Sequence, residues 1–171
     1  MSDFPEHRPA LTGKTTVRGE DVQLEASPEG HLLHVSGAVD AAFLAQVLAQ
    51  CGFPASSIRA AGFRQWFIAG DERVASSEVK EFARILQGRA FVSDQSHGRV
   101  RIGLSGARAA EVLAKGTAID TDSDAFAEGH AAMTLFGHVS VQIARTGHDR
   151  FEFTVLRSFA ESLWEELERS L

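Results

Sequence analysis

Three aspartates at alternate positions are the side chains whose spacing most resembles a known binding site. Asp120, Asp122 and Asp124 match the first, third and fifth positions of a calcium-binding loop, where carboxylate oxygens coordinate the ion. Such a loop also requires a glycine at its sixth position and a bidentate glutamate at its twelfth. Because Ala125 and Ala131 stand there, too few ligands remain, and we predict a solvated acidic loop without a metal ion.

Serine, cysteine and histidine side chains could carry nucleophilic or metal chemistry, but they lack the required neighbours. Ser77 and Lys80 match a Ser-x-x-Lys pattern that works together with Ser-Asp-Asn and Lys-Thr-Gly elements, which the sequence lacks. Cys51 ends a predicted helix, where the helix dipole disfavours a thiolate. His31 and His34 stand three apart on a predicted strand, so their side chains point to opposite faces. We therefore predict no catalytic, cofactor-binding or metal-binding residue in this chain.

The overall composition is that of a globular protein that does not seek polyanions. Apolar residues make up 44% and charged residues 23%, so the chain of 171 residues can bury a core. The net charge is −6 and no stretch gathers lysine and arginine, which argues against nucleic acid or an anionic membrane as the main partner. The sequence shows neither a membrane-length apolar stretch nor a signal peptide. With a single cysteine, these features predict a cytoplasmic protein.

The elements that must position any site form an internal echo. A predicted strand over 33–36 ends at Ser-Gly and leads into a helix that begins near residue 41. A second predicted strand over 102–105 also ends at Ser-Gly and leads into a helix that begins near residue 110. In both cases the glycine permits a sharp turn directly into an amphipathic helix.

The echo continues with a second strand and helix after each of these segments. A predicted strand over 65–69 precedes a helix with apolar residues on one face between 79 and 86. A predicted strand over 151–156 precedes a helix with apolar residues at four-residue steps over 159–171. The two tryptophans fall within these periodic elements, so we expect them in the core.

We therefore predict a flexible N-terminal arm over 1–16 and a single duplicated α+β domain over 17–171. The two halves span about 17–88 and 89–171, and each has the order strand, helix, strand, helix. We expect their strands to pair in one antiparallel sheet that is covered by the helices.

The second half carries motifs whose order resembles a known protein family. They are Phe91-Val92-Ser93-Asp94-Gln95-Ser96, Ile102-Gly103-Leu104-Ser105-Gly106-Ala107, Lys115-Gly116 and Arg157-Ser158-Phe159-Ala160. In this order, between about residues 91 and 171, they look like the gamma subunit of heterotetrameric sarcosine oxidase. That family is similar to the wider folate-binding aminomethyltransferase fold, so the resemblance implies a duplicated α+β domain of this kind.

The resemblance also implies a complex of four different chains. The family oxidises sarcosine to glycine with formation of hydrogen peroxide, and it passes the released one-carbon unit to tetrahydrofolate. FAD, FMN and NAD are implied for the larger flavoprotein alpha and beta subunits, folate binding for alpha, and zinc for a small delta subunit. For the gamma chain itself, the resemblance implies no cofactor.

One departure from the aminomethyltransferase pattern bears on the chemistry. The resemblance implies that those enzymes use an acidic residue, in the hairpin after the second Ser-Gly helix, to hold the folate and steer the amine. Residues 131–144 stand at that place and contain no carboxylate. Hydrocarbon and hydroxyl groups cannot accept a proton or offset a developing cation, so the resemblance implies a non-catalytic subunit.

Three alternative functions stay open at this point. The chain could belong to a related complex that oxidises another N-methyl amine. It could be an independent folate-dependent protein of the aminomethyltransferase type that uses a different acid, for which Asp94 is the candidate, although a lone carboxylate at a strand end is more often a turn residue. It could also be a binding module for an unrelated protein.

Overall fold

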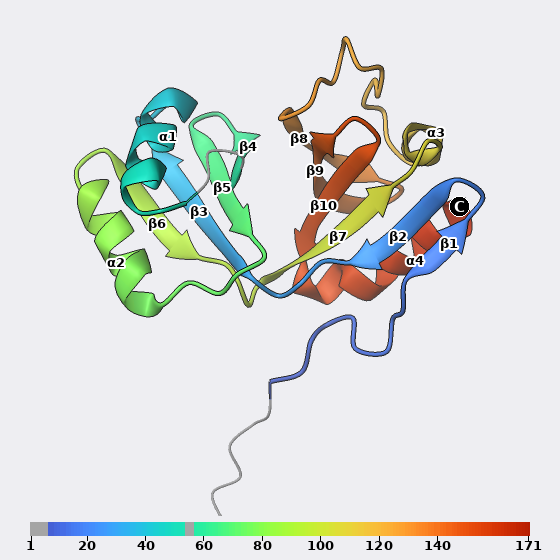
Figure 1. Cartoon of the computed structure of the whole chain (residues 1–171), viewed down its shortest axis with the longest axis horizontal. Coiled ribbons are helices and arrows are strands. Elements are labelled where there is room, and N and C mark those ends of the chain that lie inside the picture. The colour runs from blue at the N-terminus through green and yellow to red at the C-terminus, as the bar shows by residue number, and fades with distance from the viewer. Residues whose placement is uncertain (1–6, 54–56) are drawn as a thin grey trace, which may run out of the picture.

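The computed structural model describes residues 7–53 and 57–171, which form two antiparallel sheets (Figure 1). The larger sheet contains, in spatial order, β1 (Val17–Gly19), β2 (Val22–Ala26), β7 (Arg99–Ser105), β10 (Arg150–Leu156), β9 (Val139–Gly147) and β8 (Ala131–Phe136). The smaller sheet contains, in spatial order, β4 (Ile58–Gly62), β5 (Gln65–Gly70), β3 (His31–Gly37) and β6 (Ala90–Asp94).

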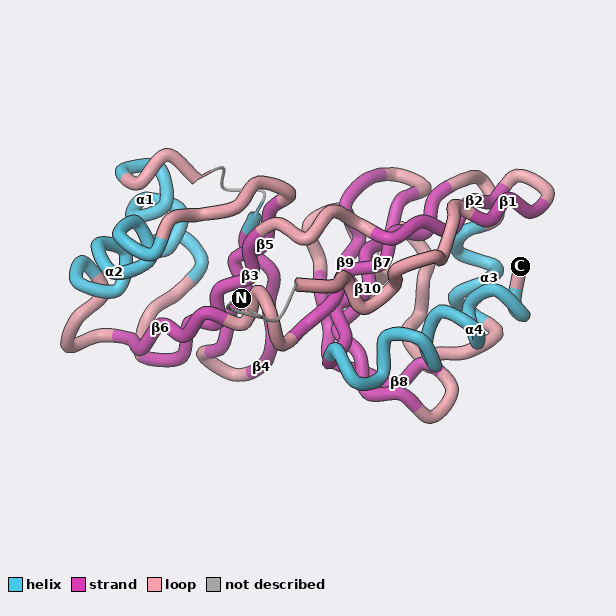
Figure 2. The backbone as a smooth tube through the Cα atoms, turned by 90° about the horizontal axis from the view of Figure 1, so that it is seen from below, coloured by secondary structure: helices cyan, strands magenta, loops and turns pink. Residues whose placement is uncertain are grey.

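Helices complete two lobes around these sheets. The small lobe is the smaller sheet with α1 (Ala41–Gln50) and α2 (Ser76–Ile85). The large lobe is the larger sheet with α3 (Ala109–Ala114) and with α4 (Ala160–Ser170), which follows the 3-10 turn η2 (Arg157–Phe159). Figure 2 shows α1 and α2 at the outer end of the small lobe, while α4 runs along the larger sheet towards the C-terminus. Among the described residues, no helix has the length and apolar character that crossing a bilayer requires.

The predicted α+β class and the antiparallel pairing of strands are confirmed, but the prediction of one sheet is wrong. Each lobe has its own apolar core under its helices, with Phe82 fully buried in the small lobe and Trp164 in the large lobe. Trp66 is half-buried and packs against the small-lobe core. Alternation along a strand identifies its apolar face, but it does not reveal which strand lies beside it.

The two lobes exchange strands relative to the order of the chain. β6 opens the predicted half 89–171, yet it pairs with β3 in the small lobe. β1 and β2 open the predicted half 17–88, yet they belong to the large lobe, where β2 pairs with β7. The predicted boundary near residue 88 therefore does not coincide with the boundary between the lobes, because the large lobe contains β1 and β2 and the small lobe contains β6.

The two glycines of the echo sit where the exchanged strands arrive. A Cβ atom on Gly37 would collide with the backbone of Arg89, immediately before β6. A Cβ atom on Gly106, whose φ is 120°, would collide with the backbone of Asp21, immediately before β2. Each glycine thus permits both a turn into a helix and the close approach of the strand contributed by the other half.

The predicted arm over 1–16 is described only from residue 7. Leu11 is buried against the core of the large lobe, and the guanidinium of Arg157 donates a hydrogen bond to the backbone carbonyl of Arg8. The imidazole of His7 lies 2.5 Å from the carboxylate of Glu29. These contacts attach the described part of the arm to the large lobe, and the flexibility of the whole arm stays a prediction.

Candidate functional site

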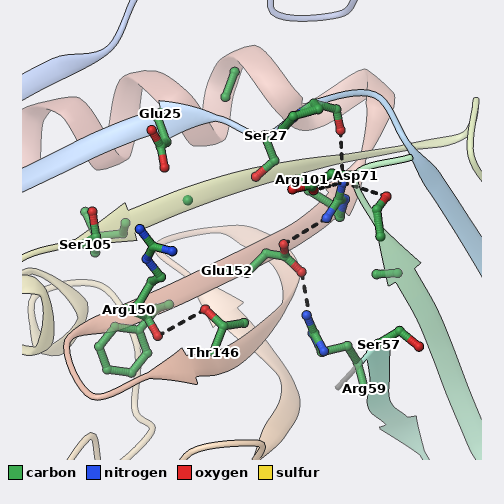
Figure 3. A pocket seen from close by; sticks show the side chains of 17 residues that line it. Glu25, Ser27, Ser57, Arg59, Asp71, Arg101, Ser105, Thr146, Arg150 and Glu152 are labelled. Atoms are coloured by element: carbon green, nitrogen blue, oxygen red, sulfur yellow. Dashed lines mark hydrogen bonds and ion pairs between the residues drawn. The ribbon is translucent and has the colours of Figure 1, made fainter. Parts of the chain in front are cut away.

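A cavity of 540 Å³ lies between the two lobes and collects charged side chains from both (Figure 3). The large lobe contributes alternate residues of its central strands. Ile102 and Phe153 point into the large-lobe core, so Arg101 and Glu152 beside them point to the opposite face, towards the small lobe. The small lobe contributes Arg59 and the end of β5.

Arg101 is the most extensively bonded side chain of the cavity. It is 7% exposed, and its guanidinium donates to the carboxylate of Glu152 at 3.1 Å. It also donates to the carboxylate of Asp71 at 2.8 Å and to the carbonyl oxygens of Gly70 and Pro28 at 2.9 and 3.0 Å. Gly70 ends β5, Asp71 follows it, and Pro28 lies in the β2–β3 connection, so this one arginine fastens β7 to the small lobe.

Glu152 lies between two arginines that come from different lobes. Its side chain is 12% exposed, and its other carboxylate oxygen lies 3.5 Å from Nε of Arg59, whose side chain is 13% exposed. Figure 3 shows Arg59 reaching Glu152 from the side opposite to Arg101. Both carboxylate oxygens of Glu152 therefore face an arginine of the same chain.

One residue that lines the cavity, Gly103 on β7, has no side chain. Gly103 pairs with Glu25 on β2 and with Glu152 on β10, so the three residues form one row across the sheet. A Cβ atom on Gly103 would lie 3.3 Å from Cγ of Glu25, which shows how closely that side chain covers the glycine. Glu25 and Glu152 lie two strands apart, so their backbones are separated by roughly 10 Å.

The charges of this cavity balance. Its lining includes three arginines and three carboxylates, which are Arg59, Arg101, Arg150, Glu25, Asp71 and Glu152. A balanced set does not attract a charged ligand by its net field. The geometry therefore describes an ionic junction between two lobes, and the described residues contain no group of three His, Cys, Asp or Glu side chains placed to hold a metal ion.

Further contacts between the lobes surround this junction. The side-chain amide of Gln142, on β9, is fully buried and donates to the carbonyl of Ala60, on β4, at 2.5 Å. The guanidinium carbon of Arg99, on β7, lies 4.7 Å from the ring centre of Phe67, on β5. A second cavity of 770 Å³, lined in part by α1, β4 and Trp66, adjoins these contacts. The junction thus combines charged, amide and aromatic contacts.

The candidate carboxylates from the sequence lie outside the junction. Asp120 and Asp122 each accept a backbone hydrogen bond from the residue two positions later, at 3.1 and 2.9 Å, and all three aspartates of this loop are exposed. Asp94 is exposed at the end of β6, where it accepts the backbone N–H of Ser96 at 2.9 Å. Partial burial would raise the pKa of Asp94. Hydrogen bonds from Ser96, together with the electrostatic effect of His97 and His31, outweigh burial and lower the pKa.

The serine, lysine, cysteine and histidine candidates from the sequence also lie outside the junction. Ser77 and Lys80 are exposed on α2. Cys51 caps the end of α1, and burial together with the negative charge of Glu81 raises the pKa of its thiol. His31 is buried, with Nδ1 2.7 Å from the carbonyl of Glu72.

Sequence reasoning missed the ionic junction, although a signal was present. Arg101 stands between Val100 and Ile102, and Glu152 stands between Phe151 and Phe153, so each charge is flanked by apolar residues on both sides. This pattern places the charges on the face away from the core. It gives no sign that a second lobe covers that face.

The comparisons with known proteins agree with this architecture. Residues 36–170 match the family described as "Sarcosine oxidase, gamma subunit family". A chain of the heterotetrameric sarcosine oxidase from Corynebacterium sp. U-96, solved in complex with pyrrole 2-carboxylate, is 22% identical with a TM-score of 0.76, and the match covers 91% of this chain and 86% of that one. A search of curated proteins found no match.

A second solved structure links the fold to a wider group. The glycine cleavage system aminomethyltransferase T from Bartonella henselae is 16% identical with a TM-score of 0.59. The match covers 86% of this chain but only 45% of the aminomethyltransferase. The predicted aminomethyltransferase-like α+β fold is therefore confirmed.

Proposed function

Because the chain belongs to the sarcosine oxidase gamma subunit family, we propose that it is a non-catalytic subunit of a heterotetrameric sarcosine oxidase. One observation carries the non-catalytic part of this proposal. Glu152, in the cavity between the lobes, is occupied by Arg101 and Arg59 of the same chain. A general base must instead have a carboxylate oxygen that is free to reach the proton it abstracts.

The hairpin that follows α3 supports the same proposal. β8 and β9 contain no carboxylate, and two polar side chains of this hairpin bond within the chain. The hydroxyl of Thr134 lies 3.2 Å from that of Thr117, and the amide of Gln142 donates to Ala60. This hairpin therefore keeps the fold but offers no carboxylate that could accept a proton from an amine.

In this proposal the chain assembles with larger alpha and beta flavoprotein subunits and a small delta subunit. FAD, FMN, NAD and zinc belong to those partners, and tetrahydrofolate accepts the one-carbon unit on them. Two observations support this assignment of NAD and zinc to the partners. Its sequence has no Gly-x-Gly-x-x-Gly motif for a dinucleotide, and its described residues form no zinc-binding cluster.

Co-expression of a tagged chain with the other three subunits tests the proposal. We expect a yellow complex that contains this chain, shows flavin absorption and oxidises sarcosine, and we expect the purified chain alone to oxidise no methylamine derivative. Omission of the chain should reduce the yield of the complex. Recovery of an active complex without this chain, while the chain itself purifies as a lone monomer, would show that the proposal is wrong.

The substrate of the complex is tested separately. The purified complex is assayed with sarcosine and with other N-methyl amino compounds, and hydrogen peroxide is measured. The proposal expects sarcosine to give the highest kcat/KM. A higher value for another N-methyl amine would assign the chain to a related oxidase complex.

A further inference from the structure

Two phenylalanines stand out because nothing in the described chain covers them. Phe63 is 87% exposed and Phe91 is 85% exposed, whereas the other exposed large apolar side chains are between 43% and 55% exposed. A single exposed apolar side chain is ordinary on a protein surface, but two almost uncovered aromatic rings in one region indicate a contact surface.

Both phenylalanines lie at one end of the small sheet. Phe91 pairs with Ser36 on β3, and Ser36 pairs with Gln65 on β5, so the three residues form one row. Phe63 lies in the β4–β5 turn, and the backbone N–H of Gly37 donates to the carbonyl of Arg64 in that turn at 3.1 Å. The turn is thereby held beside the row that contains Phe91.

The pleat of the sheet shows which way Phe91 points. Val92 and Val35, its neighbours on β6 and β3, pack against the core beneath the helices. Phe91 therefore points to the face of the sheet that has no helix. β6 is also the edge strand of the small sheet, so no strand of the described chain lies beyond it.

Two arginines accompany these aromatic rings. The guanidinium carbon of Arg64 lies 5.2 Å from the ring centre of Phe63. Arg89 immediately precedes β6, and its guanidinium carbon lies 4.8 Å from the ring centre of Phe43 on α1. Both arginines are exposed, and neither forms an ion pair with any carboxylate in the described part of the chain. We call Phe63, Arg64, Arg89 and Phe91 the aromatic–basic patch. It is basic although the whole chain has a net charge of −6.

We propose that the aromatic–basic patch is the surface by which this chain docks on another subunit of the oxidase, at an acidic site with an apolar hollow. This inference rests on the proposed function and adds the docking face to it. Aromatic and arginine side chains are the residues that most often dominate the energy of protein interfaces. Arg64 and Arg89 form no ion pair with a carboxylate in the described part of the chain. They therefore favour a partner surface rich in carboxylates, because opposite potentials steer the two surfaces together.

The test uses the complete four-chain complex. A tagged chain is co-expressed with the other three subunits, and the recovered partner subunits are quantified. The Phe63→Ser/Phe91→Ser double variant should recover about tenfold less partner than the wild type, as expected when interface anchors are lost. The Arg64→Glu/Arg89→Glu variant should recover less partner as well, and its loss should shrink as salt is raised.

Matched controls separate this face from general effects. Leu135→Ser changes an exposed apolar residue of the large lobe, and Arg18→Glu changes an exposed arginine of β1. Both should recover partner subunits like the wild type. Thermal unfolding should show all variants folded, because the altered side chains are exposed. Wild-type recovery for the Phe63/Phe91 variant, or an equal loss for Leu135→Ser, would overturn the proposed face.

A photo-crosslinking amino acid at position 91 identifies the occupant directly. The proposal expects a crosslink to an acidic segment of another subunit, and a crosslink only to a second copy of this chain would overturn it. Failure of the wild-type chain to recover any partner subunit would contradict the proposed function itself. Normal wild-type recovery with normal recovery for the double variants would contradict the docking face alone.

Discussion

The guanidinium of Arg101 donates a hydrogen bond to the carboxylate of Glu152 at 3.1 Å, across two adjacent strands whose polar face is covered by another lobe. Gly103 lies opposite Glu152, so the arginine reaches the carboxylate diagonally past a residue without a side chain. The pair matters because Arg101 and Arg59 extend it to the small lobe. It is therefore a connection between the lobes, and its removal should affect the whole molecule.

We predict that Glu152→Gln lowers the free energy of unfolding by about 2–3 kcal/mol, because it leaves two largely buried guanidinium groups without their shared anion. Asp71→Asn is the matched control. Asp71 contacts the same arginine but is 64% exposed, so its loss should cost less than about 1 kcal/mol. Urea unfolding of the purified chain measures both values. Equal values for the two variants would contradict a special role for the buried pair.

Gly106 should tolerate no side chain. Its φ of 120° and its closeness to the backbone of Asp21 lead us to predict that Gly106→Ala destabilises the chain by about 2 kcal/mol or more. Gly98→Ala serves as the comparison, because a Cβ there would meet only ordinary contacts with Gln95. Thermal unfolding gives the difference in Tm. A variant at position 106 as stable as the variant at position 98 would refute the close approach of β2.

The pH dependence of stability should carry a contribution from Asp94. Its folded pKa is lowered, because hydrogen bonds from Ser96 and the electrostatic effect of the nearby histidines outweigh the opposing effect of burial. A lowered folded pKa means that the stabilisation is present above the unfolded pKa, near 3.9, and is lost as the pH falls through the folded value. Asp94→Asn should therefore be less stable than the wild type at pH 6, and the gap should narrow below about pH 4. A gap that stays constant between these pH values would contradict this prediction.

Cys51 should react slowly with thiol reagents. Burial and the nearby charge of Glu81 raise the pKa of its thiol, so less thiolate is present at neutral pH than in an unfolded peptide. We predict that alkylation by iodoacetamide at pH 7.5 is slower for the folded chain than for the chain in urea. Glu81→Gln should increase the rate in the folded chain, since it removes one of the two causes. An unchanged rate in this variant would show that the carboxylate has no influence on the thiol.

Local pattern was sufficient for the elements of this fold. The Ser-Gly turns at Gly37 and Gly106 and the strands before them lie where the sequence predicts, because strand alternation and glycine turns depend on neighbouring residues only. The neighbours of each strand were not predictable in this way. β6 follows α2 in the chain and pairs within the lobe that contains α2. β2, in contrast, pairs with β7, which is far away in the sequence.

The candidate site shows the same limit. The alternation around Arg101 and Glu152 predicts that both point away from the core, and they do. Whether such a charge meets water or a second lobe depends on how the two sheets are placed, which no local pattern records. Asp94 and Asp122 were candidates because of their residue type. In the structure, each carboxylate accepts a hydrogen bond from the backbone N–H of the residue two positions later.

The reciprocal exchange of β2 and β6 also constrains how the polypeptide matures during synthesis. β1 and β2 leave the ribosome before the other strands, but the partner of β2, β7, is made only after every strand and helix of the small lobe. The small lobe in turn lacks its edge strand until the first residues of the second half have emerged. A nascent chain interrupted between the halves thus carries one orphaned hairpin and one incomplete sheet, and duplicated halves expressed separately should regain structure only when mixed.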